Sequence, residues 1–127
     1  MSKPNISAEV VLPFGDGPHN FALKWKQLEH LEKACNSSVS EIAGRVIGLA
    51  PRCDDVKNVI QLGLEGGGMP PVQVQQMMDR YFDSPLASTS AEMSNLLLAA
   101  KIMEAAWFGV DDIKPGELKA GEAPATE

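Results

Sequence analysis

From Trp25 onward, apolar residues recur every third or fourth position, and this spacing constrains the fold more than any other feature of the sequence. Residues at this spacing lie on one face of an α-helix. Turn formers or prolines interrupt the pattern at Asn36-Ser37, Ala50-Pro51, Gly66-Gly67-Gly68 and Ser84-Pro85. We therefore expect about five helices, each separated from the next by a short break.

Several local signals predict where these helices begin. Ser38-Val39-Ser40-Glu41 and Thr89-Ser90-Ala91-Glu92 match the capping box, in which a hydroxyl and a carboxylate satisfy free amides. Asp54 is expected to cap a third helix, and Pro70-Pro71 suits the start of a fourth. The last helix, from Met93 to Phe108, is apolar on more than one face, which is typical of a central helix or of one shared with a partner.

The residues from Ser7 to Trp25 have a different pattern. The stretch Ala8–Leu12 is rich in β-formers, and Asn20–Trp25 alternates apolar and polar residues. Between them, Phe14–His19 is dense in turn formers. This pattern predicts a β-hairpin with a slightly long loop and with Phe21, Leu23 and Trp25 on one face. The predicted fold class is therefore α+β, predominantly helical: an N-terminal β-hairpin followed by about five α-helices.

The length of 127 residues suits a single domain, which we expect to span residues 7–109. Residues 1–6 are expected to be a flexible N-terminus. After Gly109 the sequence loses its periodicity, so residues 110–127 are expected to form a solvated C-terminal tail. Apolar residues make up 44% of the chain, enough for one ordinary core.

Charge and hydropathy exclude several kinds of partner. The formal net charge is −6 and no cluster of basic residues offsets it, so we expect no nucleic-acid partner. No apolar run has the length that a membrane span needs, and the first residues lack the apolar stretch of a secretory signal. We expect no membrane partner and a cytoplasmic location.

The sequence offers no recognisable catalytic, metal or cofactor site. Gly66-Gly67-Gly68 lacks the lysine and hydroxyl of a phosphate-binding loop, and a helix-breaking linker is the favoured interpretation. Cys35 and Cys53 form no Cys-x-x-Cys motif, and neither histidine stands at a metal-ligand spacing from them. We therefore expect a protein that is not an enzyme and that uses no metal or cofactor.

Two features suggest a surface for another protein. Met77, Met78, Tyr81 and Phe82 fall on one helical stripe, which is typical of core packing but also of adaptable binding surfaces rich in methionine. The predicted hairpin offers an edge strand to a partner, with Val10 and Leu12 in it. Trp107, near the end of the last helix, is the remaining candidate.

Three segments carry a resemblance to a known family: Trp25–Glu32, Asp55–Gly68 and the final Leu/Ala-rich helix Asn95–Phe108. Together with the preceding hairpin, they resemble the small tail proteins of gene transfer agents and related siphophages. This family is described both as tail assembly chaperone and as phage tail tube protein. The resemblance covers residues 7–109, and Pro70-Pro71 departs from the more acidic helix start expected in the family.

The resemblance implies a non-catalytic role in virion assembly. Tail assembly chaperones bind the long, helical tape-measure protein and keep it soluble in the cytoplasm until tube subunits polymerise around it. One alternative is a structural tube or minor tail component that self-associates and stays in the virion tail. Tube subunits are generally rich in β-sheet, whereas this sequence predicts one hairpin. A further alternative is a small host adaptor with a helix-binding groove.

Overall fold

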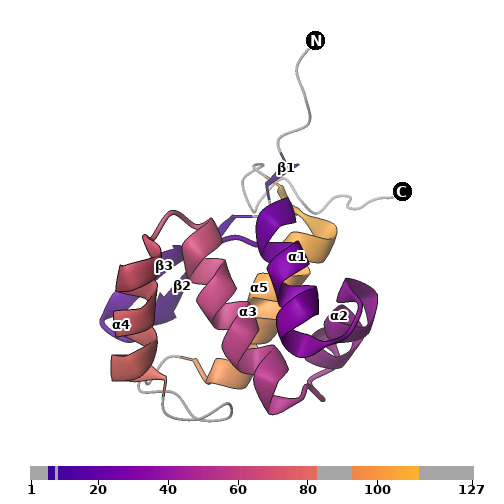
Figure 1. Ribbon diagram of the computed structural model, residues 1–127. Helices are drawn as coiled ribbons and strands as arrows, with labels where there is room; N and C mark the ends of the chain where they lie inside the picture. The colour runs from indigo at the N-terminus through magenta and orange to yellow at the C-terminus, as the bar shows by residue number, and fades with distance from the viewer. Residues whose placement is uncertain (1–5, 8, 83–92, 112–127) are drawn as a thin grey trace.

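The computed structural model describes residues 6–7, 9–82 and 93–111 and confirms the α+β, predominantly helical fold class. Strands β2 (Val10–Phe14) and β3 (Gly17–Phe21) form an N-terminal antiparallel hairpin. Five helices follow (Figure 1): α1 (Trp25–Cys35), α2 (Val39–Ile47), α3 (Cys53–Gly66), α4 (Pro71–Tyr81) and α5 (Asn95–Phe108). Two short strands, β1 (Ile6–Ser7) and β4 (Val110–Asp111), lie at the two ends of the described chain.

Helices α3 and α5 form the centre of the molecule. In Figure 1, α3 crosses the middle with α5 behind it, α1 and α2 lie on one side, and α4 and the hairpin lie on the other. Contacts between elements agree with this arrangement, because α3 touches α1, α4, α5 and β3, whereas α2 packs mainly on α5. The apolar circumference of α5 is thus explained by its central position.

One hydrophobic core joins the hairpin to the helices. Phe14 and Phe21 from the hairpin are fully buried, as are Leu64 of α3 and Ile102 of α5. The side chains of Phe21 and Ile102 both approach Gly63 of α3, so residues distant in sequence meet at one point. Such burial of large apolar side chains is the main favourable contribution to folding.

The glycines at the end of α3 end the helix and also let the hairpin pack closely against it. The amide of Ala22 donates a hydrogen bond of 2.9 Å to the carbonyl of Gly63. A Cβ atom on Gly66 would overlap the carbonyl oxygen of Ala22, and one on Gly67 would overlap that of Asn20. Only glycine lets two backbones approach this closely. The glycine run that the sequence suggested to be a linker therefore forms, through Gly66 and Gly67, part of the contact between α3 and the hairpin.

The predicted loop length and the predicted common face of the hairpin are wrong. The turn contains only Gly15 and Asp16, and Gly17–His19 belong to β3. Gly15 has φ of 65°, the conformation that a tight hairpin turn requires at its first central residue. The backbone then leaves the strand after Phe21, and Trp25 starts α1 with 77% of its surface exposed, whereas Phe21 and Leu23 are buried.

The structure confirms some of the predicted helix starts and corrects others. The Ser38 hydroxyl accepts from the Glu41 amide at 3.2 Å, the Glu41 carboxylate accepts from the Ser38 amide at 3.1 Å, and α4 begins at Pro71. Helix α3, however, begins at Cys53 after Arg52, so Asp54 does not cap it. Helix α5 begins after Ser94, which accepts from the amide of Leu97, and the predicted box at Thr89–Glu92 lies outside the described residues.

The two ends of the domain meet in a small antiparallel pair. Ile6 is opposite Asp111, and Ser7 is opposite Val110. Paired backbone therefore extends to residues 6, 110 and 111, which the sequence assigned to the flexible N-terminus and the solvated tail. Residues 1–5 and 112–127 lie outside the described part of the chain. None of the helices in the described part combines the length and hydropathy needed to cross a membrane.

Candidate partner-binding surface

The titratable side chains with shifted pKa values belong to a structural cluster between α1, α2 and α3. The Arg45 guanidinium donates to both carboxylate oxygens of Asp55, at 2.7 and 2.9 Å, and the Arg52 amide donates to the same carboxylate at 2.8 Å. Asp55 is fully buried. Burial favours its neutral form, but these hydrogen bonds outweigh burial and hold the pKa of Asp55 below its usual value. The cluster ties α2 to the start of α3.

The same cluster keeps Cys35 unreactive. Burial, followed by the nearby Asp55 carboxylate, raises the pKa of the Cys35 thiol to about 12. Its Sγ donates a weak hydrogen bond of 3.7 Å to the backbone carbonyl of Asp54. A thiol with such a pKa is almost entirely protonated at neutral pH and is a poor nucleophile. Among the described residues, no group of three or more His, Cys, Asp or Glu side chains is placed to hold a metal ion.

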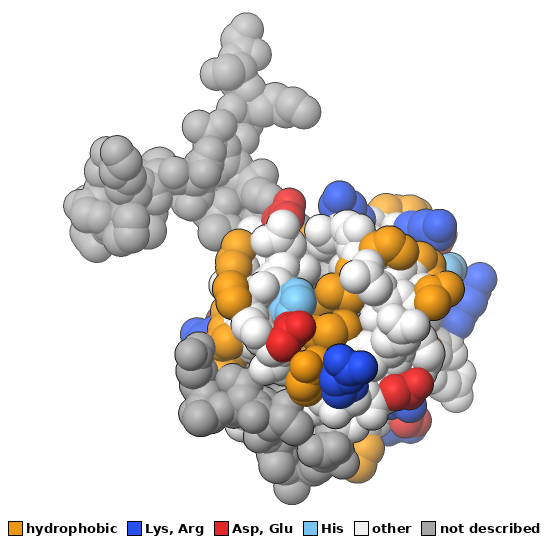
Figure 2. Space-filling view, turned by 90° about the vertical axis from the view of Figure 1, so that its left-hand side faces the viewer, with side chains coloured by type: hydrophobic (Ala, Val, Ile, Leu, Met, Phe, Trp, Pro, Cys, Tyr) orange, Lys and Arg blue, Asp and Glu red, His pale blue; other side chains and the backbone are white. Residues whose placement is uncertain are grey.

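The methionine and aromatic stripe at the end of α4 packs against the core, and Tyr81 contacts the hairpin turn. Met78 is 3% exposed, and Met77, Tyr81 and Phe82 are partly buried against the core. The Tyr81 ring meets the Phe14 ring edge to face, with 6.3 Å between centroids, and it also covers Gly15. In Figure 2, which views the molecule from the side of α4 and the hairpin, exposed apolar patches alternate with isolated charged side chains.

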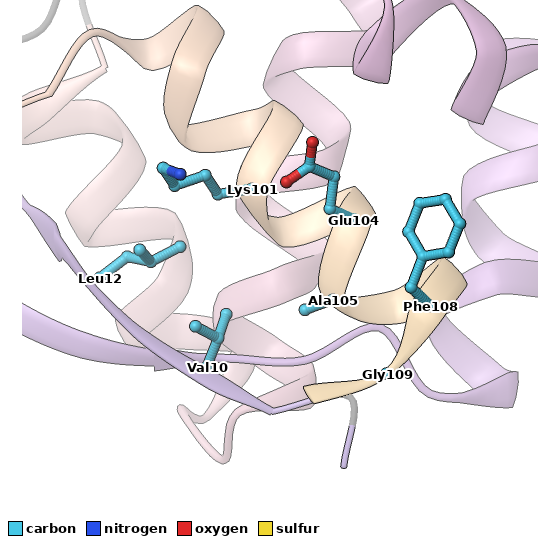
Figure 3. Close-up of a pocket in the computed structure, with 7 residues that line it drawn as sticks. All are labelled: Val10, Leu12, Lys101, Glu104, Ala105, Phe108 and Gly109. Carbon is cyan, nitrogen blue, oxygen red and sulfur yellow. The ribbon is translucent and has the colours of Figure 1, made fainter. Parts of the chain in front are cut away.

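The predicted hairpin residues line a groove between β2 and α5. Its volume is about 320 Å³, and its walls are formed by Val10, Leu12, Lys101, Glu104, Ala105, Phe108 and Gly109. We call this depression the β2–α5 groove. Figure 3 shows the side chains of Val10 and Leu12 on the strand side, with Ala105 and Phe108 along the end of the helix. Phe108 lies at one end of the groove and is 70% exposed. The groove therefore includes a large apolar side chain that the rest of the chain does not cover.

The open edges of the hairpin are poorly suited to pairing with another strand. The two-residue turn makes Phe14 and Gly17 the first hydrogen-bonded pair, so the next pair, Pro13 opposite Pro18, directs its backbone groups outward. Proline has no amide hydrogen, and each outer edge therefore lacks a donor at this position. Natural sheets use such prolines to prevent edge-to-edge association. Recognition at this site would rest on side chains in the groove.

The structure brings together only part of the predicted surface. Val10 and Leu12 line the β2–α5 groove, although Leu12 itself is only 8% exposed. Met77, Met78 and Tyr81 lie on α4 and Phe82 directly follows it, outside the groove walls. Trp107 is 49% exposed but does not line the groove either. The sequence did not indicate Ala105, and it left open whether Phe108 belongs to the core or to an interface. Phe108 is directly followed by Gly109, which ends the helix. A position at the end of a helix is the one sequence signal that favoured exposure of this aromatic residue.

Comparison with known proteins identifies a family. A family model described as phage tail tube protein, GTA-gp10, matches residues 7–109 and so covers the hairpin and the helices α1 to α5. The match confirms the resemblance to tail proteins of phages and gene transfer agents over the same range. No curated protein and no solved structure matches the chain.

Proposed function

The chain belongs to the phage tail tube protein family GTA-gp10, and we propose that it acts as a non-catalytic assembly chaperone that binds the tape-measure protein while the tail is built. The observation that carries this proposal is the β2–α5 groove, an apolar depression with the exposed ring of Phe108 at its end. Exposed aromatic residues beside a recess are typical of protein-binding surfaces.

The shape of the groove suits a helical partner. Lys101, Glu104 and Phe108 follow one another at helical spacing, so the helix wall extends over two turns, or about 10 Å. A helix that lies in such a groove inserts apolar side chains at the same spacing. The tape-measure protein is expected to be largely helical, and one of its apolar helix faces would supply those side chains. Lys101 and Glu104 at the rim would then contribute more to orientation than to affinity.

The hairpin supports a chaperone in preference to a tube subunit. Tube subunits generally close their rings through strand pairing, which requires continuous free edges. In this chain the β2–β3 sheet has two strands, and Pro13 and Pro18 remove an amide donor from each outer edge. The second candidate function is nevertheless a structural component of the tail, because the family description names a tail tube protein. A host adaptor has no comparable support.

Co-expression with the tape-measure protein of the same phage or gene transfer agent tests the proposal. We expect the tape measure to be soluble only when the chain is present and to co-purify with it. Phe108→Ala should weaken this binding about tenfold, since truncating an aromatic side chain that a partner covers costs more than about 1 kcal/mol. Val72→Ala is the matched control, because Val72 is 72% exposed on α4 and lies outside the groove.

Two outcomes would contradict the chaperone function. If the tape measure neither binds nor gains solubility, the proposed partner is wrong. If the chain is present in stoichiometric amounts in purified finished tails, a transient chaperone is excluded and the structural candidate replaces it. Equal binding by the Phe108→Ala and Val72→Ala variants would move the binding site away from the β2–α5 groove.

A further inference from the structure

Trp25 has the largest exposed fraction among the large apolar side chains of the described residues, and the fold of α1 explains why. Helix α1 buries Leu31 and Cys35 against α3. With 3.6 residues per turn, Trp25 points roughly 100° away from that buried direction. Its 77% exposure therefore agrees with its direction on the helix. Tryptophan is enriched among the residues that contribute most to protein–protein binding.

The side chains around Trp25 form a shallow recess between α1 and the start of α2. It has a volume of about 190 Å³ and is lined by Trp25, Leu28, Glu29, Glu32 and Val39. We call these residues the Trp25 face. Leu28 packs partly against the core, and Val39 begins α2. The four residues from α1 span two turns, or about 10 Å, which matches a contact with two turns of another helix.

The charge of the Trp25 face selects the kind of partner. One Glu32 oxygen accepts a 2.7 Å hydrogen bond from the Val39 amide, which fixes this carboxylate beside the recess. Within the described part of the chain, neither Glu29 nor Glu32 has a cationic partner within 4 Å. Lys26 and Lys33 lie on the neighbouring face of α1, roughly 80–100° around the helix from Trp25. Lys33 is nevertheless one turn from Glu29, so its charge partly offsets that carboxylate. The residues that line the recess itself include two carboxylates and no basic side chain.

We infer that the Trp25 face docks an amphipathic helical segment of another protein that carries lysine or arginine beside its apolar side chains. An apolar residue of that segment would cover Trp25 and enter the recess next to Leu28 and Val39. Its cationic residues would pair with Glu29 and Glu32, so that charge complementarity steers the encounter and fixes the orientation. This surface is additional to the β2–α5 groove and serves a separate partner or a separate segment.

Peptide binding to the full-length chain tests the inference. The probe is a synthetic helical peptide of leucine and lysine, with two controls of equal length: one has glutamate in place of lysine, and one has serine in place of leucine. In a Trp107→Phe background, Trp25 is the remaining tryptophan and its fluorescence reports the contact. We expect saturable binding and a blue shift with the leucine–lysine peptide, and at least tenfold weaker binding of each control.

Variants then locate the binding surface by calorimetry. Trp25→Ala should weaken binding of the leucine–lysine peptide at least tenfold, and Glu29→Gln about threefold, without a change in thermal unfolding. Phe108→Ala and Val72→Ala should leave it unchanged. Equal binding of the serine–lysine peptide would mean that binding depends only on the net charge of −6, and it would overturn the inference. The inference also fails if Trp25→Ala has no effect or if Phe108→Ala removes binding, whatever the outcome with the tape measure.

Discussion

At the residue scale, two helical glycines in this chain stand in opposite surroundings. Gly66 lies under the carbonyl of Ala22, so the hairpin and α3 approach through backbone atoms. Gly44 lies inside α2, and a Cβ atom added there would meet nothing within 4 Å. The first glycine is required by packing, whereas the second only lowers helix propensity. The same residue type therefore has opposite consequences at the two positions.

Gly66→Ala is expected to destabilise the protein by at least about 2 kcal/mol, because the new methyl group overlaps the carbonyl oxygen of Ala22 and forces the hairpin away. Gly44→Ala, the matched control, should stabilise it by about 0.5–1 kcal/mol. Urea unfolding of both variants and the wild type measures the two changes. A Gly66→Ala variant as stable as wild type would contradict the close contact between Gly66 and the hairpin.

At the scale of elements, α2 is fastened by its apolar face and by one buried charge pair. Ile42, Ala43 and Val46 are buried, and α2 packs mainly on α5. Toward α3 the connection is the bidentate pair between Arg45 and Asp55. Asp55 also accepts the Arg52 amide at the start of α3, so one carboxylate joins a helix start to a neighbouring helix. Removing the Asp55 carboxylate leaves the partly buried guanidinium of Arg45 without its partner.

Asp55→Asn is expected to cost about 3 kcal/mol of stability near neutral pH, whereas Asp54→Asn, at an exposed neighbouring position, should cost less than about 1 kcal/mol. The folded pKa of Asp55 is lowered, so its contribution is complete above the unfolded pKa of about 3.9 and is lost as the pH falls toward the folded pKa. Urea unfolding between pH 7 and pH 2 measures this. An unchanged acid dependence in Asp55→Asn would contradict the assignment.

At the scale of the whole molecule, one core spans every layer. Phe21 of the hairpin, Gly63 of α3 and Ile102 of α5 meet at its centre, and α1, α2 and α4 each contribute buried side chains. The β1–β4 pair brings the two ends of the domain together. With no separate second core in the described residues, local parts of the structure have little to support them alone.

We therefore expect cooperative unfolding, and Cys35 offers a sensitive test. In a Cys53→Ser variant the remaining thiol is buried and has a pKa of about 12, so it should react with a thiol reagent only after unfolding. Its pulse-labelling midpoint in urea should coincide with the midpoint from far-UV circular dichroism. The matched Cys35→Ser variant keeps the exposed Cys53 and should react before unfolding. Separate midpoints would mean that α1 opens independently of the rest.

The sequence predicted most of the fold because the signals involved are local. Helical periodicity, the Ser38 capping box and the proline start at Pro71 each depend on residues within one turn of one another, and the structure confirms them. The prediction that Trp25 shares a face with Phe21 and Leu23 was wrong because it, too, rested on local signals. Alternation and helical spacing both fit it locally, and only packing of α1 against α3 decides which direction is buried.

The sequence by itself determined the fold class, the order of the hairpin and the five helices, and the family. Tertiary structure alone decided which residues come together: Asp55 pairs with Arg45, Phe21 packs on Gly63, and Val10 and Phe108 line the same β2–α5 groove. It also packed the stripe of Met77 to Phe82 against the core while leaving Phe108 and Trp25 exposed. Periodicity reports that a helix has an apolar face, but the element that covers this face depends on contacts between segments distant in sequence.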